Sequence, residues 1–138
     1  ALFLLIGLLY ERHHTRIIRY YSGLIHTMPA FSVCFILFSL ANIGLPLTSS
    51  FVGEFLIILG CFEINSWAAL LCATGMVLGG GYSLWLLNRL LFGNLKTNSV
   101  KNLRDLTRFE FFILLPFVFL TIFLGIFPET IITYITLY

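Results

Sequence analysis

Glu54 is the one charged side chain between residues 30 and 62, a stretch that is otherwise apolar or weakly polar. An ionisable group at bilayer depth costs about 2.5 kcal/mol or more, so such residues usually face a protein interior or a water path. Glu54 lies nine residues before Glu63, which is roughly 13 Å of helix and about half of a hydrocarbon core. This depth predicts a proton or ion site. The alternative is a carboxylate that reaches the lipid headgroups, or one held in a salt bridge that has no role in transport.

The same apolar run, residues 30–62, contains a short segment that is expected to break a helix. As one straight helix, residues 30–62 would extend roughly 50 Å, longer than a bilayer requires. Pro46 removes an amide donor and clashes with the preceding turn, so we expect a break near residues 45–49. Such breaks line water-filled cavities in ion transporters, whereas a plain proline kink is the alternative. The residues expected to form the break and support the site are Asn42, Gly44, Pro46, Thr48, Ser49, Ser50 and Gly53.

The remaining reactive side chains form no catalytic pattern. The cysteines lack metal-ligand spacing and lie in apolar runs, so we expect small buried hydrophobes at Cys34, Cys61 and Cys72. The histidines lie in a basic segment, where we expect solvated or interfacial roles for His13, His14 and His26. The sequence contains no phosphate loop, dinucleotide fingerprint or catalytic triad pattern. Any redox or hydrolytic chemistry would therefore belong to partner chains.

Composition and charge distribution indicate a polytopic membrane protein. Hydrophobic residues make up 59% of the chain, charged residues 10%, and the mean hydropathy is +1.01. These values exclude a soluble globular domain. All Lys and Arg residues fall in two segments, residues 10–29 and 88–108. By the positive-inside bias, both segments face a mitochondrial matrix or a bacterial cytoplasm.

The apolar runs predict an all-α transmembrane bundle with one broken helix. Residues 1–9 are too short to span and are interpreted as the end of a helix whose first half lies elsewhere. The chain is then a fragment or one half of a split protein. The expected order is a helix end at 1–9, a basic loop at 10–29, the broken helix at 30–62, a helix at 67–92, a basic loop at 93–108, a helix at 109–127 and a tail at 128–138.

Local signals mark the start of the last span. Thr107 and Glu110 have capping-box spacing, and Asp105 suits a helix N-terminus nearby. Pro116 should kink this helix without ending it.

Four sequence motifs, and their order along the chain, resemble the C-terminal part of the NADH-ubiquinone oxidoreductase chain 4 family. This family comprises antiporter-like membrane-arm subunits of respiratory complex I. The four motifs are Tyr10-Glu11-Arg12-His13-His14-Thr15-Arg16, Leu40-Ala41-Asn42-Ile43-Gly44-Leu45-Pro46, Phe51-Val52-Gly53-Glu54-Phe55 and Gly81-Tyr82-Ser83-Leu84-Trp85. The resemblance covers essentially the whole chain. Related antiporter-like subunits generally carry lysine on the broken helix, so the glutamate in Gly53-Glu54-Phe55 favours the chain 4 type.

The resemblance implies the end of a fourteen-helix antiporter-like fold and a role in proton pumping coupled to NADH:ubiquinone electron transfer. It implies that Glu54 releases protons toward the intermembrane space, and that FMN, iron-sulfur clusters and ubiquinone lie on other subunits. Expected partners are the N-terminal part of the same subunit, possibly a separate chain, together with other antiporter-like and accessory subunits and membrane lipids, without nucleic acid.

Two other functions stay open from the sequence. One is a subunit of a multisubunit cation/proton antiporter, and the other is a purely structural membrane-arm piece. The 15 phenylalanines and the scarcity of lysine indicate an AT-rich organellar genome, so we expect the mitochondrial inner membrane, with the bacterial plasma membrane as the alternative.

Overall fold

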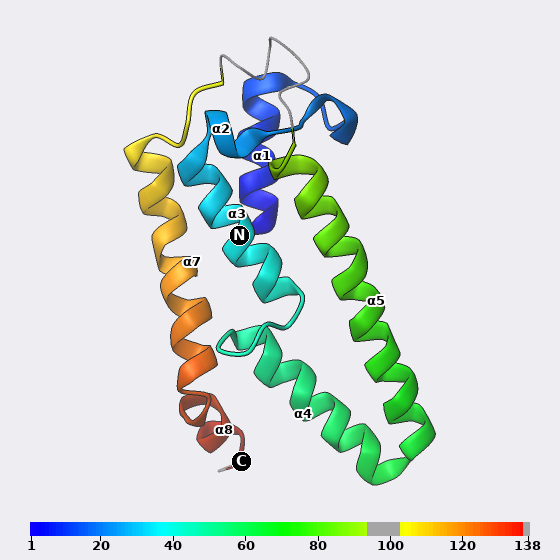
Figure 1. Cartoon of the computed structure of the whole chain (residues 1–138). Coiled ribbons are helices and arrows are strands. Elements are labelled where there is room, and N and C mark those ends of the chain that lie inside the picture. Colours follow the sequence, from blue (N-terminus) through cyan, green and yellow to red (C-terminus); the bar gives the residue numbers. More distant parts are fainter. Residues whose placement is uncertain (94–102, 137–138) are drawn as a thin grey trace. The chain divides into compact units, whose positions relative to one another are not determined.

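The computed structural model describes residues 1–93 and 103–136, which form helices and connecting segments without a β-strand (Figure 1). This confirms the predicted all-α class. The predicted basic loop at 93–108 is described only in part, because residues 94–102 lie outside the described ranges. The elements are α1 (Leu2–His13), η1 (Ile18–Tyr20), α2 (Leu24–Thr27), α3 (Pro29–Asn42), α4 (Ser49–Ile64), α5 (Ser66–Leu91), α7 (Arg108–Ile126) and α8 (Glu129–Thr136).

Two of the described helices, α5 and α7, are long and apolar enough to cross a membrane. The run at 30–62 does not form one such helix, because α3 has 14 residues and α4 has 16. Residues 43–48 between them are non-helical. The interruption therefore begins earlier than the expected 45–49, since a glycine ends α3 before Pro46 is reached.

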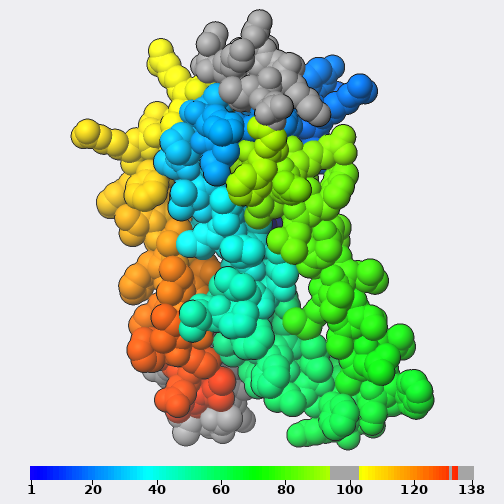
Figure 2. All heavy atoms as spheres, in the orientation of Figure 1, coloured from blue at the N-terminus to red at the C-terminus, as the bar shows by residue number. Residues whose placement is uncertain are grey.

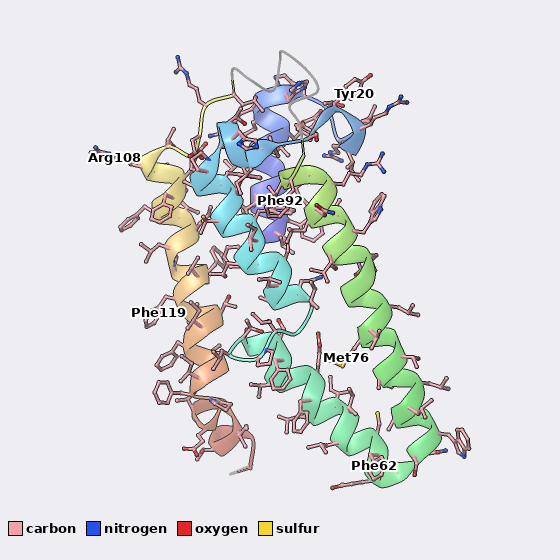
Figure 3. All side chains as sticks on the ribbon, in the orientation of Figure 1. Tyr20, Phe62, Met76, Phe92, Arg108 and Phe119 are labelled. Carbon is pink, nitrogen blue, oxygen red and sulfur yellow. The ribbon has the colours of Figure 1, made fainter. Side chains whose placement is uncertain are left out.

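The chain divides into two compact units, Ala1–Ser39 with Leu84–Phe117 and Leu40–Ser83 with Val118–Tyr138. The first unit has a core of large side chains. Its large, fully buried members are Leu5, Leu24, Met28, Phe31, Leu91 and Leu114. The second unit, which contains Glu54, buries smaller side chains: Ala41, Thr48, Ala69 and Ser83. Its large apolar side chains lie mostly on the outside, as Phe119 does on α7 (Figure 3).

A predicted capping box begins α7 in the first unit. The Thr107 amide donates to Glu110 Oε2 at 2.7 Å, and the Glu110 amide donates to Thr107 Oγ1 at 3.3 Å. Glu110 also accepts a 2.7 Å ion-pair hydrogen bond from Arg12, which is not apparent from the sequence. Arg12 additionally donates to the Leu8 carbonyl at 3.0 Å. The end of α1 is thereby fixed to the start of α7.

Asp105 binds a different helix from the one expected. Its two carboxylate oxygens accept hydrogen bonds from the Ala30 and Phe31 amides at 2.9 and 3.1 Å. These amides belong to the first turn of α3, where backbone N–H groups lack helical partners and a negative charge is favoured. Asp105 therefore caps α3 across the fold instead of α7 nearby.

Three other boundaries differ from the sequence prediction. The first helix continues past residue 9 to His13 and ends at His14, whose φ of 51° and N–H bond to the Tyr10 carbonyl close the last turn. The segment 10–29 thus contains helical turns and is not all loop. The tail at 128–138 includes α8. In contrast, α7 continues through Pro116, as expected.

Candidate functional site at the interruption between α3 and α4

Gly44 ends α3 through a Schellman motif. The Gly44 amide donates to the Ala41 carbonyl at 3.0 Å, and the Leu45 amide donates to the Leu40 carbonyl at 3.1 Å. Gly44 has a φ of 81°, the left-handed conformation that this motif requires and that glycine adopts at low cost. Pro46 follows two residues later, a position where proline is common because the helix has already stopped. The interruption is therefore a complete helix end and not a proline kink.

Leu45–Thr48 form a tight turn that starts the next helix. The Thr48 amide donates to the Leu45 carbonyl at 3.1 Å, and the Thr48 hydroxyl donates to the same oxygen at 2.6 Å. Pro46 occupies the second position of the turn, and Leu47 occupies the third with a φ of 78°. A type II turn requires such a positive φ there, usually from Gly or Asn. For leucine this conformation costs about 1–2 kcal/mol, so the turn stores strain next to the site.

Glu54 lies in the second turn of α4, and its side chain extends back to the helix interruption. Its Oε2 atom is buried and has no hydrogen-bond partner among the described residues. The carboxylate lies against Gly44, so closely that a Cβ on Gly44 would collide with Oε2. The Met76 methyl lies 3.6 Å from the same Cβ position, and Figure 3 shows Met76 pointing from α5 toward this region. Glycine is thus required here both for its backbone conformation and for the space it leaves.

Gly125 of α7 supports the turn from another side. A Cβ on Gly125 would collide with the carbonyl of Leu47 and the backbone of Thr48. Figure 1 shows the connection between α3 and α4 reaching toward the last turns of α7, and Figure 2 shows the two segments in contact. On α5, a Cβ at Gly80 would meet the Ile43 side chain at 3.2 Å. Small residues therefore allow α5 and α7 to approach the interruption closely.

The predicted site residues do not all gather around Glu54. Gly44 contacts the carboxylate, and Thr48 is buried and binds the turn. Ser49 and Ser50 form the half-buried first turn of α4. Asn42 and Gly53 are exposed, and a Cβ on Gly53 would meet nothing within 4 Å.

Sequence reasoning missed Leu47, Met76 and Gly125. A glycine inside a long apolar span is a general signal of close helix approach, but it does not identify the approaching segment. Leu47 gives no signal at all, because leucine is an unusual residue for a positive φ.

Among the described residues, the cysteines and histidines form no metal-binding cluster. Cys34 is buried as expected, but Cys61 is half-buried and Cys72 is exposed, so the expectation was wrong for these two. The two thiols, one on α4 and one on α5, lie close enough to interact with each other. No group of three or more His, Cys, Asp or Glu side chains within the described ranges could hold a metal ion. His13 stacks edge-on against Tyr21, with ring centroids 5.4 Å apart.

Residues 1–79, which include α3, the interruption and Glu54, match the family described as NADH:quinone oxidoreductase/Mrp antiporter, transmembrane. The chain belongs to this family. It is 56% identical over 129 residues to NADH-ubiquinone oxidoreductase chain 4 of Marchantia polymorpha and 53% identical to that of Arabidopsis thaliana. It is 47% identical to NADH-quinone oxidoreductase subunit M of Rhodobacter capsulatus. Each alignment covers 94% of this chain but only 25–26% of the relative.

A solved structure shows the same architecture. A chain of respiratory complex I from Thermus thermophilus with bound NADH superposes with a TM-score of 0.84 at 32% identity, covering 91% of this chain and 26% of that one. The resemblance to chain 4 expected from the sequence is thereby confirmed. The chain spans about a quarter of the length of the relatives it matches.

Proposed function

We propose that this chain forms part of a proton-translocating membrane subunit of an NADH:quinone oxidoreductase, and that Glu54 is its proton-binding group. The observation that carries the proposal is the buried Oε2 of Glu54, which lies against Gly44 without a hydrogen-bond partner in the described ranges. A buried carboxylate oxygen without a partner is costly. A bound proton removes the charge and a bound water supplies a partner, so each lowers that cost, and the site is suited to alternate between two states.

The Glu54 carboxylate lies near a helix end. The carboxylate lies against Gly44, just after the C-terminal end of α3, and Glu54 itself belongs to the second turn of α4. A helix N-terminus stabilises negative charge and a C-terminus destabilises it, each by about 0.3–1 kcal/mol at exposed sites and more when partly buried. The two helix ends therefore act on the carboxylate in opposite directions.

The chain requires partners for a complete proton path. Glu54 is the one acidic or basic side chain on α3 and α4 before the last turn of α4, whereas a path needs an entry, a relay and an exit. We propose that these lie in the remaining part of the subunit and in neighbouring complex I subunits, within a lipid membrane. FMN, iron-sulfur clusters and ubiquinone belong to other subunits in this proposal, and this chain contributes proton transfer alone.

We propose the mitochondrial inner membrane as the location, with the basic segments 10–29 and 92–108 on the matrix side. The family is a membrane family, and the relatives from Marchantia and Arabidopsis are ubiquinone-type subunits. Glu63 and Glu129 then lie toward the intermembrane space. The relative from Rhodobacter makes the bacterial plasma membrane the corresponding location in a prokaryote.

The proposal is tested with Glu54→Gln in the assembled complex, because glutamine keeps the side-chain shape and removes the titratable group. Glu63→Gln is the matched control, since Glu63 is an exposed carboxylate on the same helix. Proton uptake per electron is measured in reconstituted vesicles, with complex assembly followed in parallel. We expect a lowered ratio in Glu54→Gln only. A normal ratio in Glu54→Gln would favour a structural role, and sodium-dependent transport would favour a cation/proton antiporter.

A further inference from the structure

The first unit contains an apolar cavity of about 220 Å³ that the proposed proton site does not use. Its floor is formed by buried side chains, namely Leu9, Tyr21, Phe35 and Leu90. Its mouth is formed by exposed residues of α1 and of the segment that follows, including Ile6, Tyr10 and Arg16. The volume exceeds the 150 Å³ of an engineered cavity that binds benzene. The space is therefore large enough for a stretch of hydrocarbon chain.

Two polar side chains on the cavity wall have different surroundings. The Tyr21 hydroxyl donates to the Thr15 carbonyl at 2.8 Å, so its proton is already used in a hydrogen bond. The Arg16 guanidinium lies over the Tyr10 ring, 4.9 Å from the ring centroid, and is held at the mouth by this contact. No carboxylate within the described ranges forms a salt bridge with Arg16, in contrast to Arg12, which pairs with Glu110. The cavity thus combines an apolar floor with an exposed cation at its rim.

We propose that this cavity holds part of one acyl chain of an anionic phospholipid, with the lipid phosphate on Arg16. The combination of apolar floor and cationic rim fits an amphiphile whose charged group is negative. Arginine binds phosphate through its planar fork of donors. Basic pockets between membrane helices, on the side that carries the Lys and Arg residues, recognise anionic headgroups in this way. Arg89, whose guanidinium lies 5.0 Å from the Trp85 ring centroid, follows the wall residue Leu86 by about one turn and adds positive charge on α5.

Two other occupants would leave different signatures. A side chain from the remaining part of the subunit would fill the cavity and exclude lipid altogether. A zwitterionic phospholipid would enter without selection by Arg16. The experiment therefore compares headgroups and tests whether any lipid reaches the wall.

The test uses the intact complex in nanodiscs that contain phosphatidylglycerol or phosphatidylcholine, each with a photoreactive diazirine on the acyl chain. Peptide mass spectrometry then locates the labelled residues. We expect labelling of α1 and α5 at the cavity wall, about fivefold stronger for phosphatidylglycerol, the preference that one arginine confers at an anionic surface. Arg16→Gln should abolish the preference, Arg16→Lys should restore part of it, and Leu86→Trp should reduce labelling by both lipids.

Arg19→Gln is the matched control, because Arg19 is exposed in the same segment but does not line the cavity. It should leave the preference unchanged. Equal labelling by the two lipids in the unmodified complex would overturn the proposal. Absence of any label at the wall would show that protein fills the cavity and would overturn it as well. Both results come from the unmodified complex, so they decide the question even if a variant fails to assemble.

Discussion

Two substitutions of Gly44 should distinguish the effect of weakening the end of α3 from the effect of displacing the Glu54 carboxylate. Gly44→Ala introduces two costs. The φ of 81° is strained for an L side chain, which amounts to about 1–2 kcal/mol. In addition, the new Cβ collides with Glu54 Oε2, so the carboxylate must leave its present position. The strain alone lowers the local folding equilibrium by a factor of roughly 5–30.

Gly44→Asn retains the collision with Glu54 in full and reduces the backbone strain. Asparagine visits the left-handed region more readily than alanine, so the turn and the end of α3 should persist. Its Cβ occupies the same space as that of alanine and displaces Glu54 equally. Gly60→Ala is the control, because a Cβ there meets nothing within 4 Å, and alanine improves helix propensity by about 1 kcal/mol.

The assay is proton uptake per electron in vesicles, with the amount of assembled complex measured by native electrophoresis. We expect Gly44→Asn to assemble nearly normally with a lowered ratio, and Gly44→Ala to lose both assembly and pumping. Gly60→Ala should be normal in both respects. If Gly44→Asn pumped as well as Gly60→Ala, the position of the carboxylate against Gly44 would be irrelevant to transport and the reasoning would be refuted.

Three further predictions follow from the fold. Gly125→Ala should destabilise the assembled complex by about 1–3 kcal/mol, because the new Cβ collides with the backbone of the turn. If this variant were inactivated by heat no faster than Gly60→Ala, the prediction would be contradicted. Asp105→Ala should lower the stability of the complex by about 0.5–2 kcal/mol, because the α3 cap is lost. Asp105→Asn keeps one acceptor oxygen and should lower the stability less. Equal thermal stability of both variants and the unmodified complex would argue against the cap. Protease added outside mitoplasts should spare residues 92–108, and cleavage there would reverse the assigned orientation.

Much of the fold could be predicted from short-range patterns. The capping box at Thr107 and Glu110 depends on residues three positions apart, and the structure confirms it. The interruption before Glu54 could be expected because glycine and proline act on neighbouring backbone. Its start could not be placed from Pro46 alone, since Gly44 ends α3 first and proline then falls outside the helix.

Contacts between distant segments were not predictable in the same way. Asp105 caps a helix that begins about 75 residues earlier in the chain, and Arg12 pairs with Glu110 across 98 residues. Either carboxylate fits several partners by sequence, and only the packing of α1, α3 and α7 in the first unit selects one. Likewise, nothing local to Gly44 reveals that its missing Cβ makes room for Glu54. That pairing depends on how the turn directs α4.

The most direct test of the central claim is infrared difference spectroscopy of the assembled complex during NADH-driven turnover. If Glu54 binds and releases the transported proton, the spectrum should contain a carboxyl C=O band that shifts in heavy water. We predict that Glu54→Gln removes this band, whereas Glu63→Gln preserves it at full intensity. Carboxyl bands that are unchanged in Glu54→Gln would show that Glu54 does not change protonation during turnover, and would contradict the account.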